Sequence, residues 1–102
     1  MSTRTGRLTQ QERRFVYEIA IEEHGKVEQL GVLIEEMSEL QKEICKMVFR
    51  DSGNLNHVAE EAADVAIMLE QLEVMFPKIH EAILEYKDRK ARRLAKNLKL
   101  EV

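Results

Sequence analysis

The spacing of hydrophobic and polar residues along the chain predicts a series of amphipathic helices. Thr9 followed three residues later by Glu12 has the pattern of a capping box, which predicts a helix start at about residue 10. We expect this first helix to span 10–23 and to end at the break formed by His24-Gly25-Lys26. Residues 1–8 are small and polar, so we expect a flexible tail there and a single helical domain over residues 9–102.

The second and third helices are predicted by apolar residues at three- and four-residue spacing. The second helix ends near residue 50, and its stripe comprises Val27, Leu30, Ile34, Met37, Ile44 and Val48. Turn-forming residues fill 51–56, with Asn56 or a neighbour as the expected cap of a third helix over about 57–75. The apolar stripe of this third helix comprises Val58, Val65, Leu69, Leu72 and Phe76, with Met68 and Met75 at one edge.

A fourth helix is expected to open at Pro77, because proline is tolerated in the first turn of a helix, and to run to about Leu98. Four amphipathic helices with short connections predict an all-α, antiparallel four-helix bundle. The composition agrees: among 102 residues, aromatics make up 5% and there are 4 Gly and 1 Pro. A β-sandwich or barrel would need more of these residues.

Composition and charge exclude several classes of protein. No apolar run approaches the roughly 20 residues that span a bilayer, and the N-terminus has no signal-peptide pattern, so we expect a cytoplasmic protein without a membrane partner. Cys45 is the only cysteine, which excludes an internal disulfide and a Cys-based zinc site. The net charge of -3 argues against a dedicated nucleic-acid-binding protein.

Two pairs of carboxylates lie at the packing edges of the second and third helices. Glu61 falls within the apolar stripe of the third helix and Asp64 lies three residues on, while Glu36 and Glu39 have the same spacing beside the stripe of the second. Four clustered anions repel at low dielectric unless protons, basic partners or a cation neutralise them. Carboxylate oxygens suit Mg²⁺, with Mn²⁺ as a substitute. Solvated helix faces, or a buried salt bridge to the fourth helix, are the alternatives.

The segments Glu-Glu-Met-Ser-Glu-Leu (35–40) and Glu-Glu-Ala-Ala-Asp-Val (60–65) resemble the EExxE and ExxD motifs of the MazG-like nucleoside triphosphate pyrophosphohydrolases, an all-α superfamily. The resemblance covers about residues 26–98. It implies Mg²⁺-dependent hydrolysis of a (d)NTP to a (d)NMP and pyrophosphate by a homodimer or homotetramer. It also implies that the metal ligands and catalytic residues are Glu36, Glu39, Glu61 and Asp64.

The fourth helix carries the basic residues that a triphosphate site needs. Lys90 falls near the middle of its apolar stripe and Arg93 lies at the edge. The resemblance implies that these two residues contact phosphate, and Gln29 and Lys26 are further candidates for substrate binding. Two alternatives stay open: Lys90 extends past the core to solvent or pairs with an acidic residue, or the basic helix belongs to a small regulator or interaction protein that binds nucleic acid or a protein.

Overall fold

The computed structural model describes residues 6–102 and consists, over that range, of four α-helices and no strands. Their bounds are α1 (Gln10–His24), α2 (Lys26–Phe49), α3 (Leu55–Met75) and α4 (Ile79–Asn97). The predicted all-α class with four helices is confirmed. No helix among the described residues combines the length and apolar character needed to cross a membrane. Most of the predicted tail at residues 1–8 lies outside the described range.

The capping box predicted at the start of α1 is present. The Thr9 hydroxyl accepts a hydrogen bond from the Glu12 backbone N–H at 3.1 Å, and the Thr9 N–H donates to the Glu12 carboxylate at 2.8 Å. These two bonds satisfy N–H groups that have no partner inside the helix. Gly25 separates α1 from α2 at a φ of 87°, a conformation that disfavours residues with a side chain.

The connection between α2 and α3 differs in detail from the prediction. Asn54, and not Asn56, caps α3, because its side-chain oxygen accepts from the His57 N–H at 2.8 Å. The helix therefore begins at Leu55, two residues earlier than expected. Gly53 packs so closely on the last turns of α2 that a Cβ there would lie 2.9 Å from the Met47 backbone nitrogen, which fixes the chain reversal.

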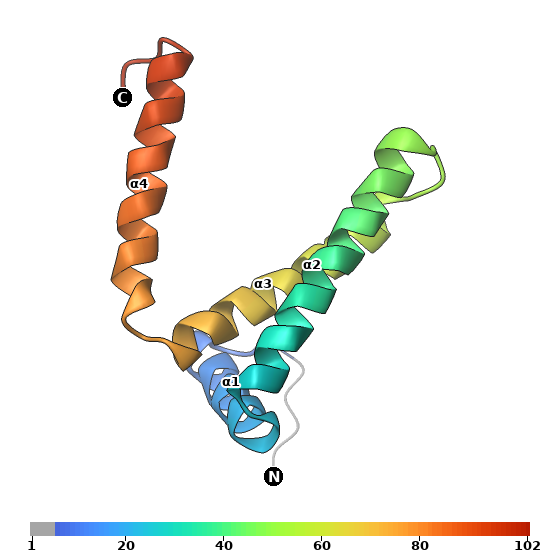
Figure 1. Cartoon of the computed structure of the whole chain (residues 1–102), viewed down its shortest axis with the longest axis vertical. Coiled ribbons are helices and arrows are strands. Elements are labelled where there is room, and N and C mark those ends of the chain that lie inside the picture. The colour runs from blue at the N-terminus through green and yellow to red at the C-terminus, as the bar shows by residue number, and fades with distance from the viewer. Residues whose placement is uncertain (1–5) are drawn as a thin grey trace.

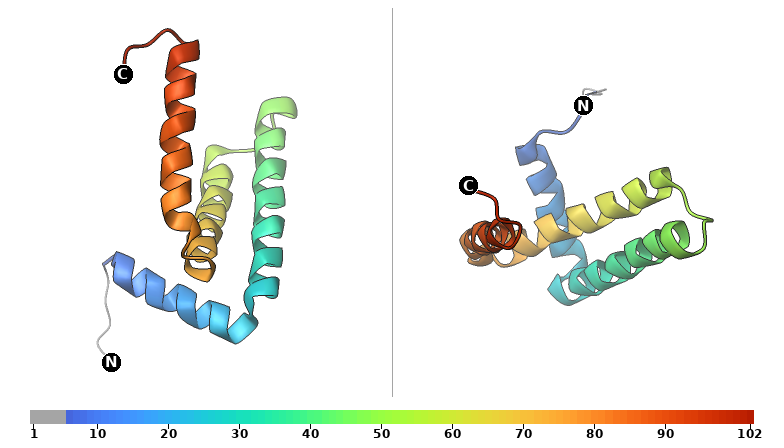
Figure 2. Two further views of the ribbon diagram at one scale, coloured as in Figure 1. Left: turned by 60° about the vertical axis from the view of Figure 1, so that its left-hand side comes forward. Right: turned by 90° about the horizontal axis from the view of Figure 1, so that it is seen from above.

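The four helices form a V rather than a closed bundle within one chain. α2 and α3 pack together as a long hairpin, α1 contacts both, and α4 turns away after Pro77 without packing along any of them (Figures 1 and 2). The radius of gyration is 17.1 Å, compared with about 13 Å for a compact chain of this length. Within one chain, therefore, only α1, α2 and α3 pack around a common core, whereas four helices were expected to do so.

The predicted apolar stripes of α2 and α3 are only partly buried. The buried residues are Gln29 and Leu33 of α2 and Met68, Gln71 and Met75 of α3, of which Met68 and Met75 were predicted at the edge of the stripe. Leu30, Val58, Val65 and Leu72 of the stripes are half-buried. Other stripe residues stay exposed, namely Ile34, Met37, Ile44, Val48, Leu69 and Phe76. The exposed part of the stripes has no covering element among residues 6–102.

Candidate functional site

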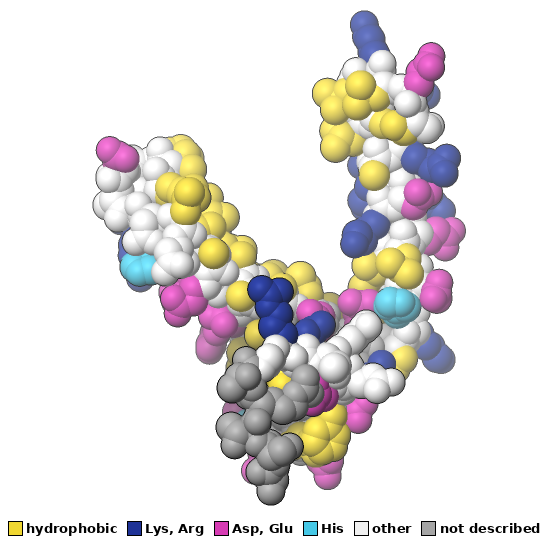
Figure 3. Space-filling model, turned by 180° about the vertical axis from the view of Figure 1, so that it is seen from behind, with side chains coloured by type: hydrophobic (Ala, Val, Ile, Leu, Met, Phe, Trp, Pro, Cys, Tyr) yellow, Lys and Arg dark blue, Asp and Glu magenta, His cyan; other side chains and the backbone are white. Residues whose placement is uncertain are grey.

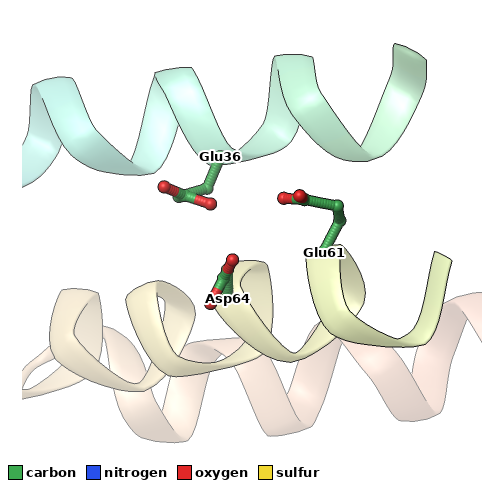
Figure 4. Close-up of side chains that lie close together, drawn as sticks. All are labelled: Glu36, Glu61 and Asp64. Carbon is green, nitrogen blue, oxygen red and sulfur yellow. The ribbon is translucent and has the colours of Figure 1, made fainter. Parts of the chain in front are cut away.

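Three carboxylates converge where α2 and α3 pack together. One ligand oxygen each from Glu36, Glu61 and Asp64 lie within 4.8 Å of one another, and Figure 4 shows the three side chains pointing into one space between the helices. The i, i+3 spacing places Glu61 and Asp64 on one side of α3, and the hairpin brings Glu36 opposite them. All three residues are half-buried. The structure thus joins three of the four predicted metal ligands.

Two carboxyl groups of the cluster, those of Glu36 and Glu61, have a raised pKa. Burial raises the pKa of Glu36, and so do the negative charge of Asp64, a hydrogen bond with Asp64, and the charges of Glu61 and Glu39. Burial also raises the pKa of Glu61, followed by repulsion from Asp64 and Glu39 among its neighbours. Both shifts have the cause expected when anions share a poorly solvated space. A proton or a cation would relieve this repulsion.

Glu39, the fourth predicted ligand, is exposed on α2 and lies outside the group of three. Its charge still raises the pKa of both Glu36 and Glu61. Glu39 is therefore close enough to act on the cluster electrostatically.

Glu43 is a further carboxylate that the motif comparison missed. One of its oxygens accepts from Lys46 at 3.3 Å, while the other is buried and has no hydrogen-bond partner among the described residues. Its charge contributes to the raised pKa of Glu61. The spacing of residues 36, 39 and 43 is i, i+3, i+7, which places them along one side of a helix, so the signal was in the sequence.

The donor set fits a hard divalent cation. Mg²⁺ binds oxygen at about 2.0–2.1 Å, so two ligands on opposite sides of one ion lie about 4.2 Å apart. The 4.8 Å spread of the three oxygens is therefore within a small side-chain rotation of shared coordination. Lys46 pairs with one oxygen of Glu43, and the other, buried oxygen accepts no hydrogen bond among the described residues.

The two predicted phosphate ligands lie elsewhere. Lys90 and Arg93 are exposed on α4, where they line a surface hollow of about 300 Å³ with Tyr86 and Arg89. The Arg89 guanidinium lies over the Tyr86 ring, 5.4 Å from its centroid. Because α4 is not packed on α2 or α3, this chain does not bring its own Lys90 and Arg93 against the carboxylates.

Gln29 and Lys26, the two further candidates for substrate binding, instead form contacts between α2 and α3. Gln29 is buried, and its side-chain amide donates to Gln71 at 2.8 Å across the α2–α3 interface. A ligand would reach Gln29 only if that hydrogen bond opened. The Lys26 ammonium lies 5.3 Å from the centroid of the Phe76 ring. Lys26 is ten residues before Glu36, about 15 Å along the helix, and so is remote from the cluster.

A cavity of about 510 Å³ lies between α1 and the region where α3 leads into α4. The Tyr17 hydroxyl donates to Glu70 at 2.9 Å, and the His80 ring lies 2.6 Å from Glu73. Burial raises the pKa of Tyr17, and the hydrogen bond to Glu70 raises it further. These polar groups pair with one another, so they join α1 and the start of α4 to α3.

No family model, curated protein or solved structure matches the chain. The functional interpretation therefore depends on the chemistry of the carboxylate cluster and on the two motifs that supply it.

Proposed function

We propose that this protein is a Mg²⁺-dependent nucleoside triphosphate pyrophosphohydrolase of the MazG-like type, acting as a cytoplasmic homo-oligomer. The observation that supports this function best is the convergence of Glu36, Glu61 and Asp64 from the two motif-bearing helices. The motif resemblance implies this convergence, and two separate solvated helix faces do not produce it.

The carboxylates would hold the metal and manage the proton of the attacking water. Glu36, Glu61 and Asp64 are the ligands, with Glu39 beside them. A bound Mg²⁺ would neutralise triphosphate charge and lower the pKa of a coordinated water. Glu39 or Glu43, whichever is not engaged on the metal, accepts the proton as the water oxygen bonds to the α-phosphorus. The bond from the α-phosphorus to the bridging oxygen breaks, and that oxygen leaves with pyrophosphate.

The direct test of this function is the identity of the product. The protein is incubated with Mg²⁺ and a panel of NTPs and dNTPs, and pyrophosphate and orthophosphate are measured separately. We expect pyrophosphate and a nucleoside monophosphate from at least one substrate. Orthophosphate as the direct product, without pyrophosphatase present, would contradict the proposal. EDTA should abolish the reaction and added Mg²⁺ should restore it.

A second test measures the metal without any substrate. A ligand that binds only the folded state raises the free energy of unfolding, by about 2.7 kcal/mol when the ligand is at one hundred times its dissociation constant. The melting temperature rises as a result. We expect Mg²⁺ or Mn²⁺ to raise the Tm at neutral pH. The increment should shrink at mildly acidic pH, because protons compete with the metal for carboxylates. An increment that is equal at both pH values would count against carboxylate ligation.

The second candidate function is that of a small helical regulator whose basic α4 binds nucleic acid. The free-standing position of α4, with Tyr86 and Arg89 stacked on its surface, favours this candidate. Phosphate binding by such a helix would weaken with salt in proportion to the number of contacts. A nucleic-acid titration at two salt concentrations therefore separates the two functions.

A further inference from the structure

The largest feature that the proposed site leaves unexplained is the amount of uncovered apolar surface. A compact monomer of 11.9 kDa exposes about 5,900 Å², whereas this chain exposes 8740 Å². No side chain described here that counts as large is fully buried. The excess, roughly 2,800 Å² per chain, is more than the 800 Å² or so that each partner buries in a standard interface, and two such chains together could bury an area as large as the largest obligate homodimer interfaces, about 5,000 Å² or more.

This surface gathers on the two arms of the V. On the hairpin it includes Ile34 of α2 and Leu69 of α3, and on α4 it includes Leu84 and Leu94, each at least 45% exposed. Figure 3 shows hydrophobic side chains along the sides of both arms that face the open space between them. An amphipathic helix that packs against nothing gains little from its apolar face, so α4 needs a covering surface.

The charges of the two arms are complementary. Residues 26–75, which contain the hairpin, carry eleven Asp and Glu against four Lys and Arg, whereas residues 79–99 of the α4 arm carry seven Lys and Arg against three Asp and Glu. Opposite charges of this kind attract and orient two surfaces that also bury apolar area. The chain itself therefore supplies both halves of an interface.

We propose that α4 is an exchanged arm: in a symmetric homodimer, α4 of each copy docks on the open face of the α2–α3 hairpin of the other. The contact is self-complementary, as a two-fold axis requires. It covers the apolar stripes that the isolated chain exposes, and it brings basic residues of one copy to the acidic hairpin of the next. A second consequence rests on the proposed function: Lys90 and Arg93 of one copy complete the carboxylate site of its partner.

Oligomeric state is the first measurement, made in EDTA so that it does not depend on metal or activity. Light scattering after gel filtration should give twice the chain mass of 11.9 kDa.

Leu94→Glu should weaken dimerisation by at least about 100-fold, because it places a charge in an apolar interface. Phe15→Glu is the matched control, since Phe15 is 64% exposed and Leu94 59%, and Phe15 lies across α1 from the buried Tyr17. Circular dichroism checks that both variants stay helical. A monomeric wild type, or equal effects of the two substitutions, would overturn the proposal.

Cross-linking then distinguishes an exchanged α4 from one that folds back on its own hairpin. In a Cys45→Ser background, Ile44→Cys and Leu94→Cys are combined in one chain and treated with a short bismaleimide. Exchange predicts covalent dimers, and also a covalent heterodimer when two differently tagged chains each carry one of the cysteines. A covalently closed monomer and no heterodimer would overturn exchange.

Mixed dimers test the shared site separately. Glu61→Gln and the double variant Lys90→Ala/Arg93→Ala are each expected to be inactive or nearly so. Random pairing after co-refolding gives heterodimers in which one of the two sites is intact, so about a quarter of wild-type activity should return. If the wild type is active but mixing restores nothing, the shared site is wrong, while the mass and cross-linking results still decide the dimer. If the wild type is itself inactive, the proposed function fails instead.

Discussion

The α2–α3 hairpin and α4 are both amphipathic, yet they use their charged residues in opposite ways. In the hairpin, packing draws Glu36, Glu61 and Asp64 together, and burial raises the pKa of the first two. On α4, Lys90 and Arg93 stay in solvent because no helix packs against them. The pKa of a charged side chain thus changes when another helix packs against the helix that carries it. In the hairpin, α2 and α3 pack against each other within one chain, whereas α4 has no such neighbour.

The largest effect is expected when one carboxylate of the cluster is removed, which tests whether packing in the hairpin gives these side chains their function. Glu61→Gln should lower Mg²⁺-dependent pyrophosphate release by on the order of 100-fold or more, because it deletes a metal ligand. The same change should raise the Tm of the metal-free protein, since it relieves repulsion within the cluster. Activity is measured by pyrophosphate release and stability by thermal melting in EDTA.

The matched control is Glu60→Gln, which removes the same charge from the neighbouring, exposed position on α3. It should leave activity and metal-free stability nearly unchanged. Equal losses of activity in the two variants would indicate that overall charge, and not ligation, is responsible. A Glu61→Gln protein that melts earlier and still binds metal would identify Glu61 as a structural residue.

On the α4 side, the corresponding change is the removal of single cations. Lys90→Ala and Arg93→Ala should each lower kcat/KM by about tenfold, because a charge-assisted hydrogen bond contributes roughly 1.5–3 kcal/mol. Arg89, which lines the same hollow, and Lys96 are the comparison cations, and Arg89→Ala and Lys96→Ala should have little effect on hydrolysis. If all four substitutions instead weaken DNA binding alike, each lowering the salt slope by about one unit, α4 is a nucleic-acid-binding helix.

The periodicity of the sequence was sufficient to predict where the helices lie along the chain, but not which helices pack against one another. Thr9 with Glu12 located the start of α1 because a capping box is formed by residues three apart. The motif spacing likewise grouped Glu61 with Asp64, which share one side of a single helix. Both predictions concern short stretches of chain in which helix geometry alone fixes the relation between side chains.

Predictions that required knowing what a helix packs against were less successful. In a closed bundle the stripe containing Leu69 and Phe76 would be buried, but α3 buries Gln71 and the edge residues Met68 and Met75 and leaves Leu69 and Phe76 exposed. Hydrophobic spacing identifies an apolar face without identifying the element that covers it, and a second copy of the chain leaves the same pattern as an internal helix. For the same reason the sequence alone did not show that Lys90 stands apart from Glu61 in one chain.

The smallest expected effect, and the one that most directly probes the hairpin, is the pH dependence of stability without metal. Folding raises the pKa of Glu36 and Glu61 above the 4.5 typical of an isolated Glu, so the folded state holds these protons more tightly than the unfolded state. The stability that this difference contributes is present below about pH 4.5 and is lost as the pH rises through the folded pKa values.

In EDTA, the Tm advantage of Glu61→Gln over the wild type should therefore grow as the pH is raised from 4.5 towards 7. Saturating Mg²⁺ should reverse the trend, because the ion binds ionised carboxylates and stabilises the wild type most at neutral pH. Parallel profiles for wild type and Glu61→Gln would mean that the three carboxylates do not repel one another in the folded protein, which would remove the electrostatic reason for placing a cation among them.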